Sequence, residues 1–260
     1  MFAAISTAVL GCAAPQRSER DAQASECERQ RASEQSWSPQ VVEIGRSVQN
    51  RPIEMHIFGR GPVALLVFAC IHGDEIGARA VADGLVEELT RERFNLSRRI
   101  LVIPVASPDG VARGSRKNSR SVDLNRNFPA KNWEPGVGRQ YGTRPASEPE
   151  TRALIQVIED YEPAFIISIH SITGGRECNN FDGPAEHLAN VLHQHNGYRI
   201  TPSIGYPTPG SFGSWAGHDR GLPVVTLELP RGLIGKAAWI AQRDALMAAV
   251  DWAMSQASSK

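Results

Sequence analysis

Runs of apolar residues alternate with amphipathic stretches through most of this chain. Short apolar runs are typical of buried strands, and apolar residues spaced by three and four are typical of helices packed on a sheet. In the run at 63–70 almost every position is apolar, which indicates a strand buried on both faces. We predict strands at 41–46, 53–58, 63–70, 100–105, 164–169 and 223–229, and helices at 76–89, 149–158, 184–195 and 236–254.

This order of elements predicts the fold class. The first two strands flank a Gln-Asn-Arg-Pro turn at 49–52, which indicates a hairpin. The later strands alternate with helices, which favours parallel pairing. We therefore predict a single α/β domain over 39–256, with a mixed, largely parallel twisted sheet, helices on both faces and a hairpin at one edge.

Three polar segments interrupt the pattern. Pro108-Asp109-Gly110 reads as a turn after a strand, and Ser147-Glu148-Pro149-Glu150 reads as a capping box that opens a helix. Periodicity is lost from 112 to 133, where polar residues crowd together. Ordered loops of this length in a compact domain are usually functional.

The first 38 residues differ from the rest. Residues 2–10 are apolar but too few to span a bilayer, and Val9-Leu10-Gly11-Cys12 resembles a bacterial lipobox. We therefore predict a lipoprotein signal at 1–12, a lipid anchor on Cys12 and a periplasmic location. The alternative is a frayed apolar N-terminus on a cytoplasmic protein, since no Lys or Arg precedes the apolar run. Residues 13–38 are polar and read as a tether.

The composition argues against nucleic acid as a partner and against a cysteine-based framework. The 260 residues carry 28 Lys and Arg against 28 Asp and Glu, so no overall positive field attracts nucleic acid, and we predict no such partner. Four cysteines at irregular spacing form neither a zinc finger nor a disulfide framework. Cys70 reads as a small buried apolar residue, whereas Cys27 and Cys178 stay unassigned.

A chemical signal lies where the strand at 63–70 ends. His72 and Glu75 follow it directly, and two residues three apart at the start of a helix lie on the same side. Together they supply two of the three protein ligands of a catalytic zinc, whose fourth position stays open. Ligand sites of open α/β sheets lie beyond the carboxyl ends of the strands, which strengthens this prediction.

Four motifs in order resemble the carboxypeptidase A-like zinc peptidases, also called funnelins. They are His72-x-x-Glu75, Asp123-Leu-Asn-Arg-Asn-Phe-Pro129, the strand that ends at His170, and Thr226-Leu-Glu228. The resemblance covers about 41–254. It implies a zinc carboxypeptidase-like fold and one Zn²⁺ per chain, held by His72, Glu75 and His170.

The resemblance also implies roles for other residues. Glu228 would be the general base, and Arg116 would donate to the oxyanion, with Arg113 as the competing candidate. Asp123 would accept a hydrogen bond from His72. The residues implied to bind substrate are Asn125 and Arg126, which would bind a terminal carboxylate, and Tyr206, which would close over it.

Within this family the chain is most similar to the murein peptide amidases, through Gly142, 147–151 and 205–215. That similarity implies a murein peptide substrate, cut between γ-D-glutamate and meso-diaminopimelate. Two alternatives stay open. One is a zinc hydrolase of acylated amino acids, of the aspartoacylase and succinylglutamate desuccinylase type. The other is a catalytically silent, wall-binding lipoprotein.

Overall fold

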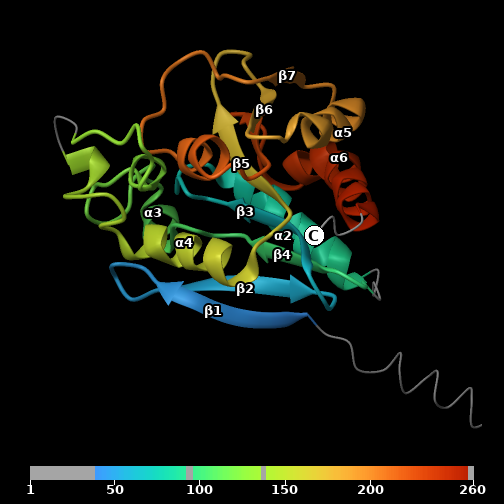
Figure 1. Ribbon diagram of the computed structural model, residues 1–260, viewed down its shortest axis with the longest axis horizontal. Helices are drawn as coiled ribbons and strands as arrows, with labels where there is room; N and C mark the ends of the chain where they lie inside the picture. Colours follow the sequence, from blue (N-terminus) through green and yellow to red (C-terminus); the bar gives the residue numbers. More distant parts are fainter. Residues whose placement is uncertain (1–38, 92–95, 136–138, 257–260) are drawn as a thin grey trace, which may run out of the picture. The chain divides into compact units, whose positions relative to one another are not determined.

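The structure, a computed structural model, describes residues 39–91, 96–135 and 139–256 (Figure 1). The predicted signal at 1–12, including Cys12, and the tether at 13–38 lie outside these residues. The described part belongs to one unit, Pro39–Lys260. None of its helices is both long enough and apolar enough to cross a bilayer.

One mixed sheet of eight strands runs through the domain in the order β1-β2-β4-β3-β5-β8-β6-β7. The four central strands, β4, β3, β5 and β8, are parallel to one another, whereas the β1–β2 hairpin pairs antiparallel with β4 at one side. On the other side β6 runs antiparallel to β8 and parallel to β7. The strands are β1 (Gln40–Arg46), β2 (Pro52–Phe58), β3 (Val63–Ala69), β4 (Arg99–Ile103), β5 (Phe165–Ile172), β6 (Cys178–Asp182), β7 (Arg199–Thr201) and β8 (Val224–Pro230).

Helices cover both faces of this sheet. On one face α6 packs against both α2 and α5 (Figure 1). On the other, apolar residues of α4 and η3 join a buried core with β2, β3 and β4. The helices are α2 (Ile76–Arg91), α3 (Pro108–Arg113), α4 (Pro149–Tyr161), α5 (Glu186–Asn196) and α6 (Gly235–Ser255), with 3₁₀ turns η1 (Leu124–Arg126) and η2 (Arg139–Tyr141) and a π-helix, η3 (Gly213–Asp219). The predicted α/β fold is confirmed.

Two predicted polar motifs are wrong in detail. Residues 108–110 form the first turn of α3 rather than a turn between elements, because Pro108 suits a first helical turn. The capping box before α4 does not form. Glu148 is the N-cap residue, and the hydroxyl of Ser147 donates instead to the Glu148 carboxylate at 2.8 Å.

Two strands were not predicted. β6 has the sequence Cys-Asn-Asn-Phe-Asp, whose asparagines and aspartate are rare in strands, and β7 has only three residues. Both lie beyond β8, where they extend the sheet past the parallel centre. β5 also continues three residues beyond its predicted end at 169, so His170 lies within the strand rather than after it.

A buried aspartate fastens the long polar loop to the hairpin. Asp109 on α3 is fully buried and accepts four hydrogen bonds. Its Oδ1 accepts from Ser47 Oγ at 2.7 Å and Arg51 Nη1 at 2.6 Å, and its Oδ2 accepts from the Gln49 backbone N–H at 2.9 Å and Ser119 Oγ at 3.0 Å. Burial alone would raise the pKa of Asp109, but these bonds hold it below its usual value. The ionised side chain therefore ties three segments together.

Replacing Asp109 by alanine leaves these donors without an acceptor, so we expect the free energy of unfolding at pH 7 to fall by about 3 kcal/mol. Asp109→Asn keeps the shape but loses charge and half of the acceptor capacity, and a smaller loss is expected. Because the folded pKa is lowered, the wild-type advantage is present above about pH 4 and shrinks as the pH falls below it. Urea unfolding at several pH values measures this. Equal midpoints for all three proteins at pH 7 would contradict it.

Candidate metal centre

The chain turns sharply after β3 to deliver His72. Cys70 adopts a positive φ of 52° directly after the strand, and Gly73 then packs on the backbone of α3. A β-carbon built on Gly73 would lie 1.9 Å from the carbonyl carbon of Gly110, so only glycine fits this approach. The close contact with α3 thus holds the segment between β3 and α2 in place.

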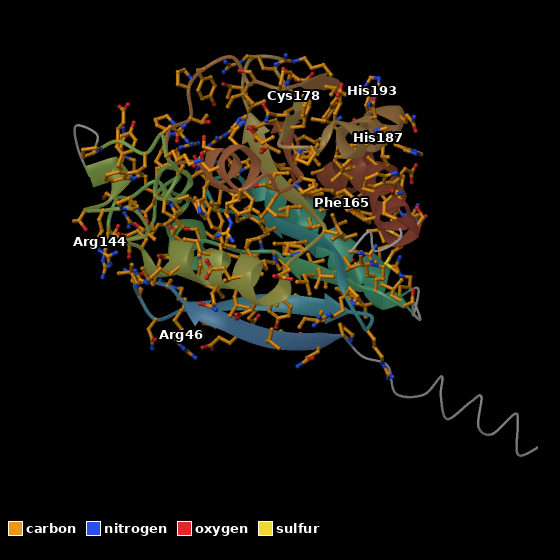
Figure 2. All side chains as sticks on the ribbon, viewed as in Figure 1. Arg46, Arg144, Phe165, Cys178, His187 and His193 are labelled. Atoms are coloured by element: carbon orange, nitrogen blue, oxygen red, sulfur yellow. The ribbon has the colours of Figure 1, made fainter. Side chains whose placement is uncertain are left out.

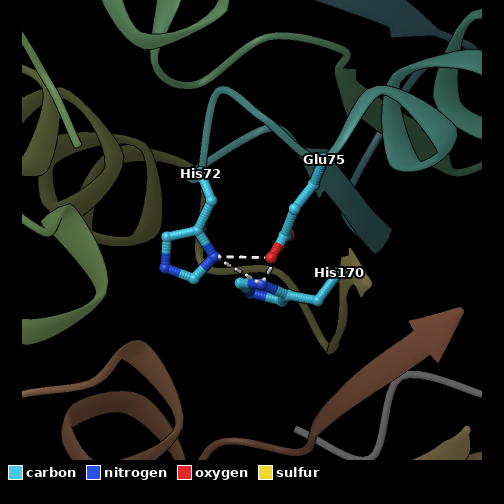
Figure 3. A group of neighbouring side chains, drawn as sticks. All are labelled: His72, Glu75 and His170. Carbon is cyan, nitrogen blue, oxygen red and sulfur yellow. Dashed lines mark hydrogen bonds and ion pairs between the residues drawn. The ribbon is translucent and has the colours of Figure 1, made fainter. Parts of the chain in front are cut away.

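His72, Glu75 and His170 converge at this end of the sheet, as Figure 3 shows. His72 Nδ1 lies 3.0 Å from Glu75 Oε1, and His170 Nδ1 lies 3.1 Å from Glu75 Oε2 and 3.2 Å from His72 Nδ1. All three residues are buried, with exposed fractions of 2–3%. Two donor atoms from the β3–α2 connection and one from β5 therefore face one point.

This donor set fits zinc. Zinc bonds of about 2.1 Å at tetrahedral angles place ligand atoms about 3.4 Å apart, close to the separations of 3.0–3.2 Å found here. Two imidazoles and one carboxylate are a donor set of catalytic zinc sites, in which the fourth position stays open. Among the described residues, no other cluster of histidine, cysteine and acidic side chains has such geometry.

The charges at this centre are strongly coupled. Burial alone would lower the pKa of His72, but Glu75 and Asp123 raise it to about 9. Burial alone would raise the pKa of Glu75, but His72 and His170 hold it well below its usual range. Glu75 is therefore ionised, and a metal ion that binds below pH 9 must displace a proton from His72.

Asp123 connects the ligands to the long loop. Its Oδ1 lies 3.1 Å from His72 Nε2 and also accepts from the Asn125 backbone N–H, while Oδ2 accepts from Arg116 Nε at 2.9 Å. Burial alone would raise its pKa, but His72 and then Arg116 hold it well below its usual range. A carboxylate on Nε2 fixes the tautomer that presents Nδ1 to a metal.

The sheet register places Glu228 beside the ligands. His170 on β5 pairs directly with Glu228 on the parallel strand β8, and residues at one register level point to the same face. Burial raises the pKa of Glu228, and Glu75 raises it further, although His170 lowers it. A raised pKa suits a group that must take up and release a proton near neutral pH.

Arg116, rather than Arg113, faces the metal centre. Arg116 Nη1 lies 3.8 Å from Glu75 Oε1, and 39% of the side chain is exposed, so the guanidinium borders both the ligands and solvent. Arg113 instead donates to the Asn118 carbonyl oxygen within the loop. Sequence reasoning missed Arg231, which pairs with Asp74 and lies 3.9 Å from Glu75 Oε1. In the sequence, only its position three residues after Glu228 could have indicated that Arg231 lies near the site.

A cavity of about 250 Å³ opens beside Glu228 and His170. Asn125 and Tyr206, the predicted substrate-binding residues, line it. Asn125 Oδ1 accepts a hydrogen bond from the Phe212 backbone N–H at 2.8 Å. The side-chain Nδ2 of Asn125 therefore points away from Phe212. Arg126 does not line the cavity. Its Nη1 donates to the Asn125 carbonyl oxygen at 2.7 Å.

Cys178 is the other residue that pairs with Glu228, on the antiparallel strand β6 (Figure 2). It is a free, buried thiol, like Cys70. Burial, and then Glu228, raise its pKa to about 11, so it stays protonated and unreactive at neutral pH. His187 and His193 lie exposed on α5 (Figure 2).

Comparisons with known proteins agree with this geometry. A model of the family described as zinc carboxypeptidase matches residues 28–175. Murein peptide amidase A of Escherichia coli (strain K12) is 35% identical over 220 residues, which cover 78% of this chain and 86% of that protein. The chain belongs to the zinc carboxypeptidase family. As a member it is a hydrolytic metallopeptidase or amidase, and the family implies zinc.

Solved structures of the zinc carboxypeptidase family share the fold. The murein-tripeptide amidase from Escherichia coli O157 matches with a TM-score of 0.66 at 30% identity, over 88% of this chain and 98% of that chain. Carboxypeptidase A from Helicoverpa armigera matches with a TM-score of 0.68 at 19% identity, over 94% of this chain and 75% of that one. At 19% identity, the similarity to carboxypeptidase A supports a shared fold alone.

Because one proton must leave His72, zinc affinity should fall about tenfold for each unit of pH below 9. Competition with a chromophoric chelator between pH 6 and 8 measures this dependence. His170→Ala removes a ligand and should lose zinc at all these pH values, whereas His187→Ala on exposed α5 should bind like wild type. An affinity that does not change between pH 6 and 8 would count against the coupling of His72 to Glu75 and Asp123.

Proposed function

We propose that this protein hydrolyses the amide bond between γ-D-glutamate and meso-diaminopimelate in murein peptides, with one zinc per chain. The observation that carries the proposal is the 35% identity to murein peptide amidase A over most of both chains. The cluster of His72, Glu75 and His170 beside Glu228 supports the hydrolytic part. The catalytically silent alternative would need no such intact set.

The residues of the site would share the chemistry as follows. Zinc held by His72, Glu75 and His170 would polarise the scissile carbonyl and make a water molecule more acidic. Glu228, buried with a raised pKa, takes the proton from that water molecule and hands it to the leaving amine. Arg116 borders the ligands and solvent, so its free guanidinium N–H groups donate to the carbonyl oxygen as negative charge develops there.

Substrate would be held on the cavity side. The peptide has a free carboxylate next to the scissile bond, and Asn125 and Arg126 are the predicted donors to it. Arg126 Nη1 donates to the Asn125 carbonyl oxygen. A guanidinium has five N–H donors, so the remaining donors of Arg126 bind the substrate carboxylate. Tyr206 is 43% exposed on the cavity wall, where it packs over a bound peptide.

Mass spectrometry of the products from L-Ala-γ-D-Glu-meso-diaminopimelate, with added zinc, tests the proposal. We expect free diaminopimelate and the dipeptide. Glu228→Gln should lower kcat/KM by at least about 100-fold, because a general base contributes that much, while zinc stays bound. Glu186→Gln on exposed α5 is the matched control and should be unchanged.

Two results would overturn the proposal. One is a zinc-loaded wild-type protein that leaves the tripeptide intact but hydrolyses N-acylated aspartate or glutamate, which points to the acyl-amino-acid hydrolases. The other is a Glu228→Gln variant as active as wild type, which removes the assigned base.

We also propose a periplasmic location with a lipid anchor on Cys12. Its support is the Val-Leu-Gly-Cys sequence at 9–12 after an apolar run. Labelled palmitate added to cells that express the protein should be incorporated, and Cys12→Ala should abolish this. Wild-type protein without label, found in the cytoplasmic fraction, would contradict the proposal.

A further inference from the structure

An arginine that the proposed chemistry does not use lies beside the metal ligands. Arg231 directly follows β8, and its Nη1 lies 3.9 Å from Glu75 Oε1. Arg116 Nη1 lies 3.8 Å from the same oxygen and is assigned to the oxyanion. Two guanidinium groups therefore border one predicted ligand, and the oxyanion accounts for only one of them.

The backbone that carries Arg231 is fixed by its neighbours. The Arg231 backbone N–H donates to the Ile172 carbonyl oxygen, at the end of β5, at 3.0 Å. Leu233, two residues later, packs on the start of α2, where a β-carbon built on Gly77 would lie 2.1 Å from the Leu233 carbonyl oxygen. A side chain on a fixed backbone loses less conformational freedom when it binds a ligand.

Asp74 orients the Arg231 guanidinium. Its Oδ2 accepts a hydrogen bond from Arg231 Nη2, while its Oδ1 is buried and out of reach of solvent. A carboxylate that binds one nitrogen of a guanidinium restricts the orientation of the whole planar group. Asp74 therefore holds Arg231 from the protein side.

Arg231 keeps unused hydrogen-bond donors. Among the described residues, its Nε makes no hydrogen bond, and its Nη1 makes only the long ion pair with Glu75. The side chain is 37% exposed, so a ligand can reach it. Unused N–H groups in one plane are suited to a planar, forked anion such as a carboxylate.

The position of Arg231 indicates which part of the substrate it meets. Neither Arg231 nor Asp74 lines the cavity beside Glu228, where the leaving group would be held. An anion bound to Arg231 must therefore belong to the part of the substrate that stays outside that cavity. This part is the acyl side of the scissile bond.

A γ-linked glutamate carries such an anion on the acyl side. A residue bonded through its α-carbonyl has no carboxylate of its own main chain left, whereas a glutamate bonded through its γ-carbonyl keeps a free α-carboxylate. Four carbon–carbon bonds, about 5 Å in an extended chain, separate this carboxylate from the scissile carbonyl carbon. The scissile carbonyl must approach Glu75, so the carboxylate can reach a guanidinium that lies 3.9 Å from Glu75.

We propose that Arg231 binds the free α-carboxylate of a γ-linked glutamate on the acyl side of the scissile bond, and that Asp74 is its positioning residue. The inference rests on the proposed function and adds a specificity-determining residue to it. A neutral group in place of the carboxylate leaves the free N–H groups of Arg231 without an anion. Arg231 therefore favours γ-linked over α-linked substrates.

Calorimetry in the zinc-loaded Glu228→Gln background measures binding without turnover. One probe is L-Ala-γ-D-Glu-meso-diaminopimelate, and the other is the same peptide with the glutamate α-carboxyl group amidated, which keeps the shape and loses the charge. We expect the acid to bind about 10- to 100-fold more tightly than the amide, as for a hydrogen bond to a charged group. Arg231→Gln should weaken binding of the acid far more than of the amide, and so reduce the preference to within about threefold.

Three further variants sharpen the assignment, with the zinc content of each measured because Arg231 borders Glu75. Arg231→Lys keeps the charge but not the planar donors, and should restore part of the preference. Asp74→Asn should reduce the preference in the Arg231 protein and have no further effect on it beside Arg231→Gln, because Asp74 acts through Arg231. Arg60→Gln, which changes an exposed arginine between β2 and β3, is the matched control and should keep the full preference.

The outcomes separate this inference from the proposed function. If Arg231→Gln weakens both peptides equally, or neither, the inference fails even where the wild-type enzyme cuts the tripeptide. If Arg116→Gln removes the preference and Arg231→Gln does not, the carboxylate binds to Arg116 and the inference also fails. If the acid is preferred in an Arg231-dependent way but wild type leaves the tripeptide uncut, the proposed reaction fails and the recognition of the carboxylate stands. Equal binding of the two peptides to the Glu228→Gln protein, or no binding of either, overturns the inference.

Discussion

The pairing of buried carboxylates with imidazoles at the end of the central strands is the interaction on which the site depends. Glu75 and Asp123 are both buried, and buried charges are tolerated only where opposite charges and hydrogen bonds compensate them. His72 contacts both acids, while His170 contacts one and Arg116 the other. The β3–α2 connection, the long loop and β5 are therefore held together by one set of charges.

The long loop could be recognised from sequence, but not its anchoring. Loss of periodicity from 112 to 133 correctly predicted an irregular segment. Its attachment depends on Asp109 and Ser119 meeting the hairpin turn, which lies far away in sequence and comes close only through the fold. The close contact between Gly73 and Gly110 could not be predicted either, because nothing in the sequence near one glycine indicates that it packs on the other.

The strands of the parallel centre were predictable because burial on both faces leaves continuous apolar runs, most clearly in β3 and β4. β6 was not, since it contains two asparagines and an aspartate, which are rare in strands, and its Asn180 and Asp182 face a cavity. The placement of His72, Glu75 and His170 followed from motifs at strand ends. Asp182 and Arg231 belong to no motif, and only the fold brings Asp182 to the cavity and Arg231 to Glu75.

The direct pairing of His170 with Glu228 limits how β8 can change over evolution. Successive residues of a strand point to opposite faces, so a single inserted or deleted residue before Glu228 would bring Leu227 or Leu229 to the metal and turn the acid into the helical layer. Substitutions of similar apolar residues leave the register intact. We therefore expect β8 to tolerate substitutions of similar apolar residues but not a change in its length.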